Sequence, residues 1–417
     1  MSIQLLPHEL NGARIKVVGI GGGGGNILNS MVDRGIEGVE FIAINTDSQA
    51  LDISKADVKI QIGKTITKGL GTGANTVLGD KAAEESREEI GRALAGSDMV
   101  FITAGMGGGT GTGASPLIAK LAKSLDILVV AIVTKPFGFE GNPRMQAALD
   151  GIEKLKREVD SLIIVPNQRI RELIHEKATK NQALALANIV LYNATKGISQ
   201  IITKTGEINV DFADVKTTMK NTGDAIIGTG IANGEGRAMR AVGEALSNPI
   251  LENVDLSGAK NVLVNIASDG NIGFDEIDLI NSQVQDAVGE KANYIFGLMD
   301  DNDIDDGEIM VTVIATGFKK EHAELTNDNT SENEYKNVIG MDDIRNGRGR
   351  LESIPEDIRT LDTPAVLRRK DSVKDMINDD LSDNQTNSFK KGIDKYGFNS
   401  DDLKDVDPPA FLRRSLD

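Results

Sequence analysis

The sequence predicts an α/β protein: a Rossmann-like parallel sheet in the N-terminal half, a long central helix, a second α+β domain and a disordered C-terminal tail. Three observations predict this class. Over the first 200 residues, short β-branched runs alternate with amphipathic helical patterns, which is typical of a parallel sheet covered on both faces. A long helical pattern follows over 181–204. From Lys319 onward, 39 of the last 99 residues are charged.

The strands are predicted from short apolar runs, and the helices from apolar residues that recur at three- and four-residue steps. Buried strands are expected in the first half at Ile15–Ile20, Glu40–Asn45, Met99–Ala104, Ile127–Thr134 and Ser161–Pro166. Helices are expected there over Lys81–Ala95 and Ser115–Ser124. In the second half, Val262–Ala267 and Ile309–Thr316 are predicted strands with a helix, Gly273–Glu290, between them.

These patterns divide the chain into five parts. We expect an N-terminal extension over 1–12, a first domain over 13–180, a linking helix over 181–204 and a second domain over 205–318. The acidic segment 319–417 is rich in Asn, Asp and Ser and poor in aromatics. Such a segment cannot bury enough apolar surface to offset chain entropy, so we expect it to be a disordered linker and tail.

The composition excludes several kinds of protein. A net charge of −17 leaves no basic excess to neutralise phosphates, so no nucleic-acid partner is expected. The chain has no cysteine for disulfides or thiolate sites, and its three histidines are too scattered for an obvious metal cluster. The longest apolar run, Ile127–Val133, is far shorter than the roughly 20 residues that cross a bilayer. The first ten residues lack the pattern of a secretion signal. We therefore expect a cytoplasmic protein without direct membrane insertion.

Five consecutive glycines, Gly21–Gly25, follow the first predicted strand, and a helical pattern begins directly after them. Glycine lets the backbone approach a phosphate, and a helix start supplies free N–H groups and a positive dipole end. Gly19, Gly21 and Gly24 also match the G-x-G-x-x-G dinucleotide pattern, with Asp47 after the next strand. An NAD-binding site is therefore one interpretation, and a glycine turn needed only for packing is another.

A second glycine-rich segment, Gly105–Gly113, also lies between a strand and a helix, and Gly69–Asn75 forms a third. Two such loops on one sheet edge favour a longer phosphate chain held from both sides. Thr110 and Thr112 add hydroxyls for phosphate oxygens or Mg²⁺. The Walker pattern is absent, because Val58 stands where its first glycine is required. We expect backbone N–H groups, without a dedicated lysine, to hold the phosphates.

Asp211 and Asp214 are candidate catalytic carboxylates. They lie three residues apart at the start of a predicted helix, so they project on one face. The plain alternative is that Asp211 caps the helix and Asp214 interacts with its dipole. Their own domain has no phosphate-binding segment, so as catalysts they fit only a nucleotide held by another molecule.

Three of these segments together resemble the FtsZ family of bacterial, tubulin-like cell-division GTPases. They are Gly21–Gly25, the G-G-G-T-G-T-G run of Gly107–Gly113, and N-V-D-F-A-D at 209–214. The second is the signature of the tubulin/FtsZ group and is highly specific. The resemblance covers Arg14 to Phe318. It implies a GTPase domain, an activation domain that carries the catalytic loop, bound GTP or GDP with Mg²⁺, and head-to-tail polymerisation.

The resemblance also implies the site residues. Asn209, Asp211 and Asp214 of one subunit would meet the γ-phosphate of the next and orient or deprotonate the attacking water. Glu140 would accept from a ribose hydroxyl with Arg144 near the nucleotide, although outside the family the two are simply a solvated ion pair. The full nucleotide-binding set is Gly21, Gly22, Gly23, Gly24, Gly25, Asn26, Thr46, Asp47, Gly73, Ala74, Gly107, Gly108, Gly109, Thr110, Gly111, Thr112, Gly113, Thr134, Pro136, Glu140, Arg144, Asn167 and Asn188.

Two positions depart from the family pattern. Asn188 stands where bacterial members usually place an aspartate that accepts from both guanine N–H groups. An amide offers one acceptor oxygen, and its amino group would oppose a guanine donor, so weaker base discrimination is expected. Gln168 replaces a residue that is commonly acidic. Because the related tubulins use asparagines against guanine, GTP stays the favoured ligand.

The tail contains a repeated peptide. Pro364–Arg369 (P-A-V-L-R-R) recurs as Pro409–Arg414 (P-A-F-L-R-R), within the segments 362–370 and 407–415. An apolar pair and two arginines on a tether favour docking to a membrane-anchored division adaptor. Such a partner would hold the protein at the division site beneath the inner membrane. Chance repetition in a biased segment is the alternative.

Three functions are therefore compared. The leading one is a GTP-hydrolysing protein that polymerises head-to-tail into the scaffold of a cell-division ring, with each active site completed between adjacent subunits. The second is an NAD-dependent oxidoreductase that uses the first glycine loop and leaves Gly107–Gly113 without a role. The third is a structural polymer of the same family that binds nucleotide and barely turns it over.

Overall fold

The computed structural model describes residues 12–173, 179–204, 206–208, 210–247, 256–289, 291–301 and 304–318. The predictions for the extension before Gly12, for Asn209 and for the tail from 319 therefore lie outside the described residues. None of the described helices combines the length and the apolarity that a membrane span requires.

Six parallel strands form the N-terminal half of the sheet, in the order β3-β2-β1-β4-β5-β6. This is the strand order of a doubly wound Rossmann sheet, which confirms the predicted fold class. In such sheets a ligand crevice forms where the strand order reverses, at the carboxyl ends of the central strands, here β1 and β4. The strands are β1 (Ile15–Ile20), β2 (Val39–Asn45), β3 (Val58–Gln61), β4 (Met99–Gly105), β5 (Leu128–Lys135) and β6 (Ser161–Pro166).

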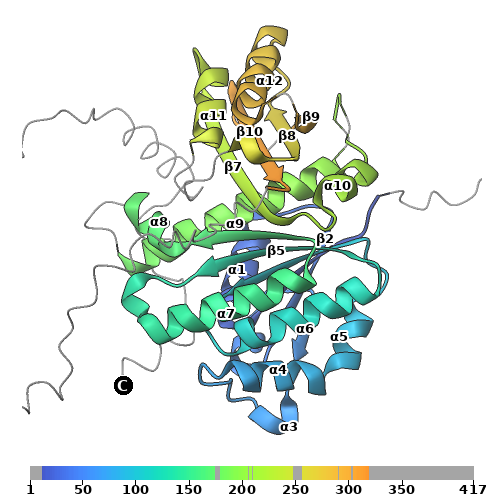
Figure 1. Cartoon of the computed structure of the whole chain (residues 1–417), viewed down its shortest axis with the longest axis vertical. Coiled ribbons are helices and arrows are strands. Elements are labelled where there is room, and N and C mark those ends of the chain that lie inside the picture. Colours follow the sequence, from blue (N-terminus) through green and yellow to red (C-terminus); the bar gives the residue numbers. More distant parts are fainter. Residues whose placement is uncertain are drawn as a thin grey trace, which may run out of the picture. The chain divides into compact units, whose positions relative to one another are not determined.

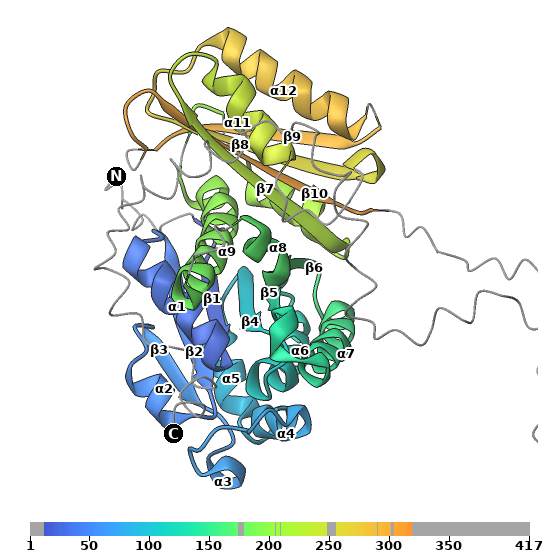
Figure 2. The same cartoon turned by 90° about the vertical axis from the view of Figure 1, so that its left-hand side faces the viewer.

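Helices cover both faces of these strands. Figure 2 shows α1 (Gly21–Arg34) and α9 (Lys180–Thr203) on one side of the sheet, and α6 (Thr110–Ser124) and α7 (Asn142–Glu158) on the other. Isoleucine, valine, leucine and alanine side chains fill the core between the layers. The other helices of this half are α2 (Ser48–Asp52), α3 (Lys64–Thr67), α4 (Thr76–Glu85), α5 (Arg87–Leu94), α8 (Asn167–Leu173) and the 3-10 turn η1 (Gly138–Glu140).

Several helix starts differ from the sequence prediction. The helix predicted from Lys81 begins earlier and is divided at Ser86 into α4 and α5. The helices α1 and α6 begin inside the glycine segments, at Gly21 and Thr110, and not after them. Glycine has low helix propensity, but here tertiary packing overrides it, because an added Cβ at Gly21, Gly24 or Gly113 would collide with neighbouring backbone. The short strand β3 was not predicted.

The second half of the sheet is mixed. Strand β7 (Gly223–Asn233) pairs parallel with β6, and then β10 (Glu308–Thr316), β8 (Asn261–Ser268) and β9 (Asn293–Asp300) follow. The predicted strands Val262–Ala267 and Ile309–Thr316 lie within β8 and β10, whereas β7 and β9 were missed. Figure 1 shows α11 (Arg237–Leu246) and α12 (Phe274–Val288) beside these strands. Their apolar side chains and those of β8 and β10 form a second core. Two short elements complete this half, α10 (Phe212–Met219) and η2 (Leu256–Gly258).

Helix α9 joins the two halves through a buried carboxylate. Asp301 follows β9, and its side chain is completely buried. It accepts hydrogen bonds from Gln200 Nε2 and Lys204 Nζ, each at 2.8 Å, and Lys196 Nζ lies 3.3 Å away. Burial alone would raise the pKa of Asp301, but the hydrogen bonds from Lys204 and Gln200 and the charge of Lys196 outweigh it and lower the pKa to about 2.

Replacing Asp301 by Asn is expected to lower the free energy of unfolding by about 3–5 kcal/mol, because two lysines lose their buried counter-charge. Since folding lowers the pKa of Asp301, this stabilisation is complete above the unfolded value of 3.8 and is lost as the pH falls from about 4 to about 2. Urea unfolding at pH 7 and at pH 3 measures both effects. The difference in free energy of unfolding between wild type and Asp301→Asn should be smaller at pH 3 than at pH 7. The exposed neighbour provides the control Asp300→Asn, and an equal loss in that variant would contradict the assignment.

Candidate functional site

A cavity of about 870 Å³ lies at the carboxyl ends of the parallel strands. Residues that end or directly follow β1, β2, β4, β5 and β6 line it, together with the loop before α4 and one face of α9. It therefore lies at the reversal of strand order, where a doubly wound sheet binds its ligands. Its volume is in the range of small-molecule and cofactor sites.

The first glycine segment brings the start of α1 against the neighbouring β4–α6 connection. An added Cβ at Gly21 would lie 2.8 Å from Gly111 N, and one at Gly24 would lie 2.4 Å from Thr103 O. Gly21 also has a φ of +70°, which favours glycine. Gly22 and Gly23 line the cavity, whereas Gly21 and Gly24 serve this backbone packing. The packing interpretation of the dinucleotide pattern thus holds for part of the segment.

The second glycine segment places the N-terminus of α6 at the cavity. Gly109, Thr110 and Gly111 line it, and no side chain of the described residues caps the free N–H groups of this helix. Gly107 has a φ of +94°, and an added Cβ would lie 2.7 Å from Arg144 O. An uncapped helix start with its positive dipole end, lining a cavity, is suited to bind an anion.

Of the threonines near these glycines, Thr72 and Thr110 line the cavity, whereas Thr46 and Thr112 do not. Thr110 Oγ1 is 2.8 Å from Thr46 Oγ1 and 3.3 Å from Thr72 Oγ1, so the three hydroxyls form a buried cluster. Thr112 Oγ1 accepts a hydrogen bond of 2.8 Å from Gly107 N and does not line the cavity. Thr112 therefore holds the glycine loop in shape, and its hydroxyl is not directed to a ligand in this arrangement.

Glu140 and Arg144 form an ion pair on the wall of the cavity. Their charged atoms are 3.3 Å apart, and the side chains are only 10% and 25% exposed. Glu140 Oε1 also accepts a hydrogen bond of 2.8 Å from Phe137 N. The pair is thus held in a fixed place at the cavity, unlike the solvated ion pair that the sequence left as an alternative.

Asn167 and Asn188 line the cavity from β6–α8 and from α9. Asn167 is 6% exposed, and its Oδ1 has no hydrogen-bond partner in the part of the chain that the structure describes. A buried acceptor left unsatisfied costs free energy, so this oxygen is available for a ligand donor. Gln168 does not line the cavity. Its Oε1 accepts a hydrogen bond of 3.3 Å from Gly138 N.

Most of the remaining predicted residues are also brought together here. Those on the cavity wall are Gly22, Gly23, Asn26, Asp47, Gly73, Ala74, Gly107, Gly108, Gly109, Thr110, Gly111, Thr134, Pro136, Glu140, Arg144, Asn167 and Asn188. Those off the wall are Gly21, Gly24, Gly25, Thr46, Thr112 and Gly113. Of these, Gly113 packs α6 on α4, since an added Cβ would lie 2.1 Å from Thr76 O.

The loop over residues 68–74 contributes more than the sequence indicated. It is joined to the turn after β2, where Ser48 N donates to Gly69 O at 3.2 Å. Lys68, at the start of the loop, lines the cavity and brings a cation that the sequence analysis overlooked. The sequence feature that could have identified Lys68 is its position directly before the third glycine segment.

The two aspartates proposed as catalysts lie away from this cavity. Asp211 caps α10, and its Oδ1 accepts from Ala213 N at 3.5 Å. Asp214 follows in the first turn, and both side chains are exposed. Within one chain, the arrangement therefore agrees with the alternative in which Asp211 caps the helix and Asp214 lies in its first turn. Neither residue lines the cavity, so a single chain does not unite the two sets of candidate residues.

The preference for an anionic ligand comes from the backbone and from one cation. The wall carries Lys68 and Arg144 against Asp47 and Glu140. Glu140 is paired with Arg144, and Asp47 caps α2 by accepting from Gln49 N and Ala50 N, which leaves Lys68 and the start of α6 to attract negative charge. Within the described ranges, no group of three or more acidic or histidine side chains is placed to hold a metal ion.

The fold and this cavity define a protein of the tubulin/FtsZ class. Residues 14–175 match the tubulin/FtsZ family GTPase domain, and residues 223–319 match the FtsZ family C-terminal domain. Among solved structures, an empty FtsZ dimer from M. jannaschii is 44% identical, with a TM-score of 0.70, over 73% of this chain and 88% of that one. A point mutant of the same M. jannaschii protein matches equally, over 74% of this chain and 92% of that one.

The chain therefore belongs to the FtsZ family, as the resemblance of its glycine and acidic segments indicated. CetZ2 from Haloferax volcanii, solved as a GTPγS-bound protofilament, shares the fold at 22% identity, with a TM-score of 0.62, over 74% of this chain and 94% of that one. The comparisons give no support to the alternative of an NAD-dependent oxidoreductase. The domain boundaries given above stay predictions.

Gly108 and Gly113 provide a test of which glycines serve the ligand and which serve the packing. A methyl group at Gly108, on the cavity wall, would meet no atom of the described residues closer than Gly105 O at 4.0 Å. Gly108→Ala should therefore keep the thermal midpoint of the apoprotein and weaken nucleotide binding at least tenfold. Gly113→Ala should instead lower the free energy of unfolding by about 1–3 kcal/mol through overpacking. Calorimetric titration and thermal unfolding measure the two effects. Normal nucleotide binding by Gly108→Ala would contradict this division.

Proposed function

We propose that the protein binds and hydrolyses GTP and polymerises head-to-tail in the cytoplasm as the scaffold of a cell-division ring. Each active site is completed between two subunits: one provides the cavity, and the next provides Asn209, Asp211 and Asp214. Family membership supports the GTPase activity in general. The matched FtsZ dimer and CetZ2 protofilament support self-association of this chain.

The observation that carries the proposal is the separation of the cavity from the acidic pair. Helix α9 lines the cavity at Asn188 and ends at Thr203, about 22 Å farther along at 1.5 Å per residue. The chain reaches Asp211 only after that end. Figure 1 shows α8, which begins with the cavity residue Asn167, and α10, which carries the acidic pair, at opposite ends of α9. A second subunit is needed to bring the carboxylates to a nucleotide.

The proposed mechanism assigns charge stabilisation and water activation to different subunits. Backbone N–H groups at the start of α6, with Lys68 and Arg144, stabilise the negative charge of the phosphates. The Asp214 carboxylate of the neighbouring subunit accepts a hydrogen bond from the attacking water and orients it in line with the γ-phosphorus, and Asp211 lies on the same helix face. Because the two contacting surfaces differ, the contact repeats into a filament.

Mg²⁺ is proposed to bind together with the nucleotide. The wall offers two carboxylates and the hydroxyls of Thr110 and Thr134. Glu140 is paired with Arg144 and Asp47 caps α2, so few protein ligands are left, which suits an ion that takes most of its ligands from phosphate oxygens and water. When bound, the ion would neutralise charge on the β- and γ-phosphates.

Turnover per subunit is expected to rise with protein concentration and to vanish for the dilute monomer, because only an assembled pair has a complete site. Phosphate release from GTP, measured over a range of concentrations with ATP as a comparison, checks this. A constant turnover per subunit down to concentrations where sedimentation shows only monomer would rule out the shared site. A bound but barely hydrolysed GTP would favour the structural-polymer hypothesis.

Mixing two inactive variants tests the division of roles directly. Asp214→Ala keeps the cavity and loses the carboxylate, whereas Gly108→Ala keeps the carboxylates and binds nucleotide at least tenfold more weakly. The mixture should regain part of the GTPase activity. Some joints would combine the intact cavity of an Asp214→Ala subunit with the intact acidic pair of a Gly108→Ala subunit, and such a joint is complete. Two variants of the same half, such as Asp211→Ala and Asp214→Ala, form the control and should regain little.

Asn188 is expected to limit the selectivity for guanine. Its single acceptor oxygen cannot pair with both guanine N–H donors, whereas its amino group can donate to the 2-oxygen of xanthine. Asn188→Asp should therefore raise the ratio of GTP to XTP affinity, by roughly 5- to 150-fold for one buried polar pair of about 1–3 kcal/mol. Competition binding with both nucleotides measures this ratio. An unchanged ratio would remove Asn188 from base recognition.

The partner proposal concerns the repeated tail peptides, which lie outside the described residues. We propose that Pro364–Arg369 and Pro409–Arg414 each bind a membrane-anchored division adaptor, which recruits the filament beneath the inner membrane. Two copies on one chain would add avidity without new contacts. Binding to adaptor-bearing vesicles should fall partly on deletion of either peptide and fully on deletion of both. Full loss on deletion of 409–417 alone would show that the first copy is inert.

A further inference from the structure

The C-terminal end of α10 is anchored to the nucleotide-binding half of the molecule. Met219 O, at the end of the helix, accepts a hydrogen bond of 2.7 Å from Ser161 Oγ, at the start of β6. Lys216 and Lys220 lie 3.8 and 3.3 Å from the Asp126 carboxylate, which precedes β5. The helix that carries the acidic pair therefore packs at the amino ends of the parallel strands, whereas the cavity lies at their carboxyl ends.

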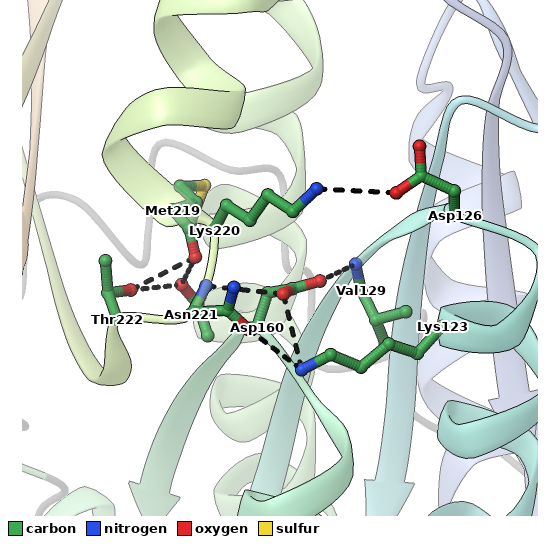
Figure 3. Close-up of polar contacts among 9 residues, drawn as sticks. Lys123, Asp126, Val129, Asp160, Met219, Lys220, Asn221 and Thr222 are labelled. Atoms are coloured by element: carbon green, nitrogen blue, oxygen red, sulfur yellow. Dashed lines mark hydrogen bonds and ion pairs between the residues drawn. The ribbon is translucent and has the colours of Figure 1, made fainter.

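Asp160 is the centre of this anchor, as Figure 3 shows. It is 2% exposed, and its Oδ2 accepts a hydrogen bond of 3.0 Å from Val129 N. Its Oδ1 accepts one of 3.3 Å from Asn221 N, in the turn after α10. Its backbone oxygen accepts from Thr222 N at 2.9 Å and from Gly223 N at 3.0 Å. One buried residue thus joins the starts of β5 and β6 to the turn between α10 and β7.

Lys123 completes the anchor from the end of α6. Its Nζ lies 3.5 Å from Asp160 Oδ1 and donates a hydrogen bond of 3.0 Å to Asn221 Oδ1. Asn221 has a φ of +56°, a left-handed conformation that asparagine tolerates better than most residues. The turn is therefore fixed by its backbone conformation and by contacts to its main chain and its side chain.

We propose that Asp160 is a positioning residue for the hydrolytic reaction, acting through α10 on the placement of Asp211 and Asp214 against the neighbouring subunit's nucleotide. The inference rests on the proposed function. Asp160 lies at the starts of the strands and the cavity lies at their ends, one strand length or about 20 Å away. A change at Asp160 therefore reaches the acidic pair and leaves the cavity of its own chain intact.

Asp160→Asn is the direct test, because it keeps the size of the side chain and removes the charge that faces Lys123. The amino group of the new asparagine cannot accept a hydrogen bond, so the bond from Val129 N or the bond from Asn221 N is lost. The variant should bind GTP within about twofold of wild type and lose at least tenfold in turnover at saturating GTP. A matched control, Asp126→Asn, makes the same chemical change at an 83% exposed carboxylate of the same cluster and should change turnover by less than threefold.

Mixing assigns the defect to one half of the shared site. Asp160→Asn with Gly108→Ala should regain activity, because the Asp160→Asn subunit contributes an intact cavity and its partner contributes an intact α10. Asp160→Asn with Asp214→Ala should regain none, because both are defective in the acidic half. A variant that merely misfolds would regain activity in neither mixture.

Three results would overturn the inference. They are wild-type turnover in Asp160→Asn, recovery with Asp214→Ala, or an equal loss in Asp126→Asn. If Asp160→Asn does not fold, Asn221→Gly keeps the left-handed backbone, removes only the contact with Lys123, and should show the same mixing pattern with a smaller loss. Failure of the reference mixture, Asp214→Ala with Gly108→Ala, would instead refute the shared site and this inference with it.

Discussion

The close approach of backbone to backbone between β1–α1 and β4–α6 is the constraint on which the site depends. The two helix starts can meet at the reversal of strand order only because no side chain stands between them. An added Cβ at Gly21 would lie 2.8 Å from a main-chain atom of α6, and one at Gly24 would lie 2.4 Å from a main-chain atom of β4. Packing at this density tolerates no extra methyl group without a backbone shift. The same absence of side chains exposes the N–H groups that suit a phosphate chain.

Much of the fold followed from sequence periodicity, and its errors have physical causes. The five buried strands of the first half were predicted because they lie under helices on both faces and read as continuous apolar runs. Strand β7 alternates buried with partly exposed residues and contains Gly228 and Gly230, which hide the pattern. Those glycines are required because an added Cβ would lie 1.9 and 2.0 Å from carbonyl oxygens of α11. Such a requirement arises from a partner distant in sequence, and a local pattern does not report it.

The candidate site was predictable to the extent that it is made of backbone. Runs of glycine are easy to recognise in a sequence, so most residues of the cavity wall were identified from it. Side chains that act through geometry were harder to place. The sequence did not show that Thr112 bonds to Gly107 N, that Gln168 supports Gly138, or that Lys68 enters the cavity. These roles depend on how loops fold onto each other, and they carry no motif.

In the proposed filament, the distance between the cavity and the acidic pair would make the two ends chemically unequal. Every internal joint would pair one cavity with one set of carboxylates, but at one end a cavity would have no neighbour. In the proposed filament, the nucleotide held there would stay a triphosphate while older joints convert theirs. Short rows would carry proportionally more unconverted nucleotide than long ones. The nucleotide state along the proposed filament would thus indicate the age of each joint and the direction of the filament.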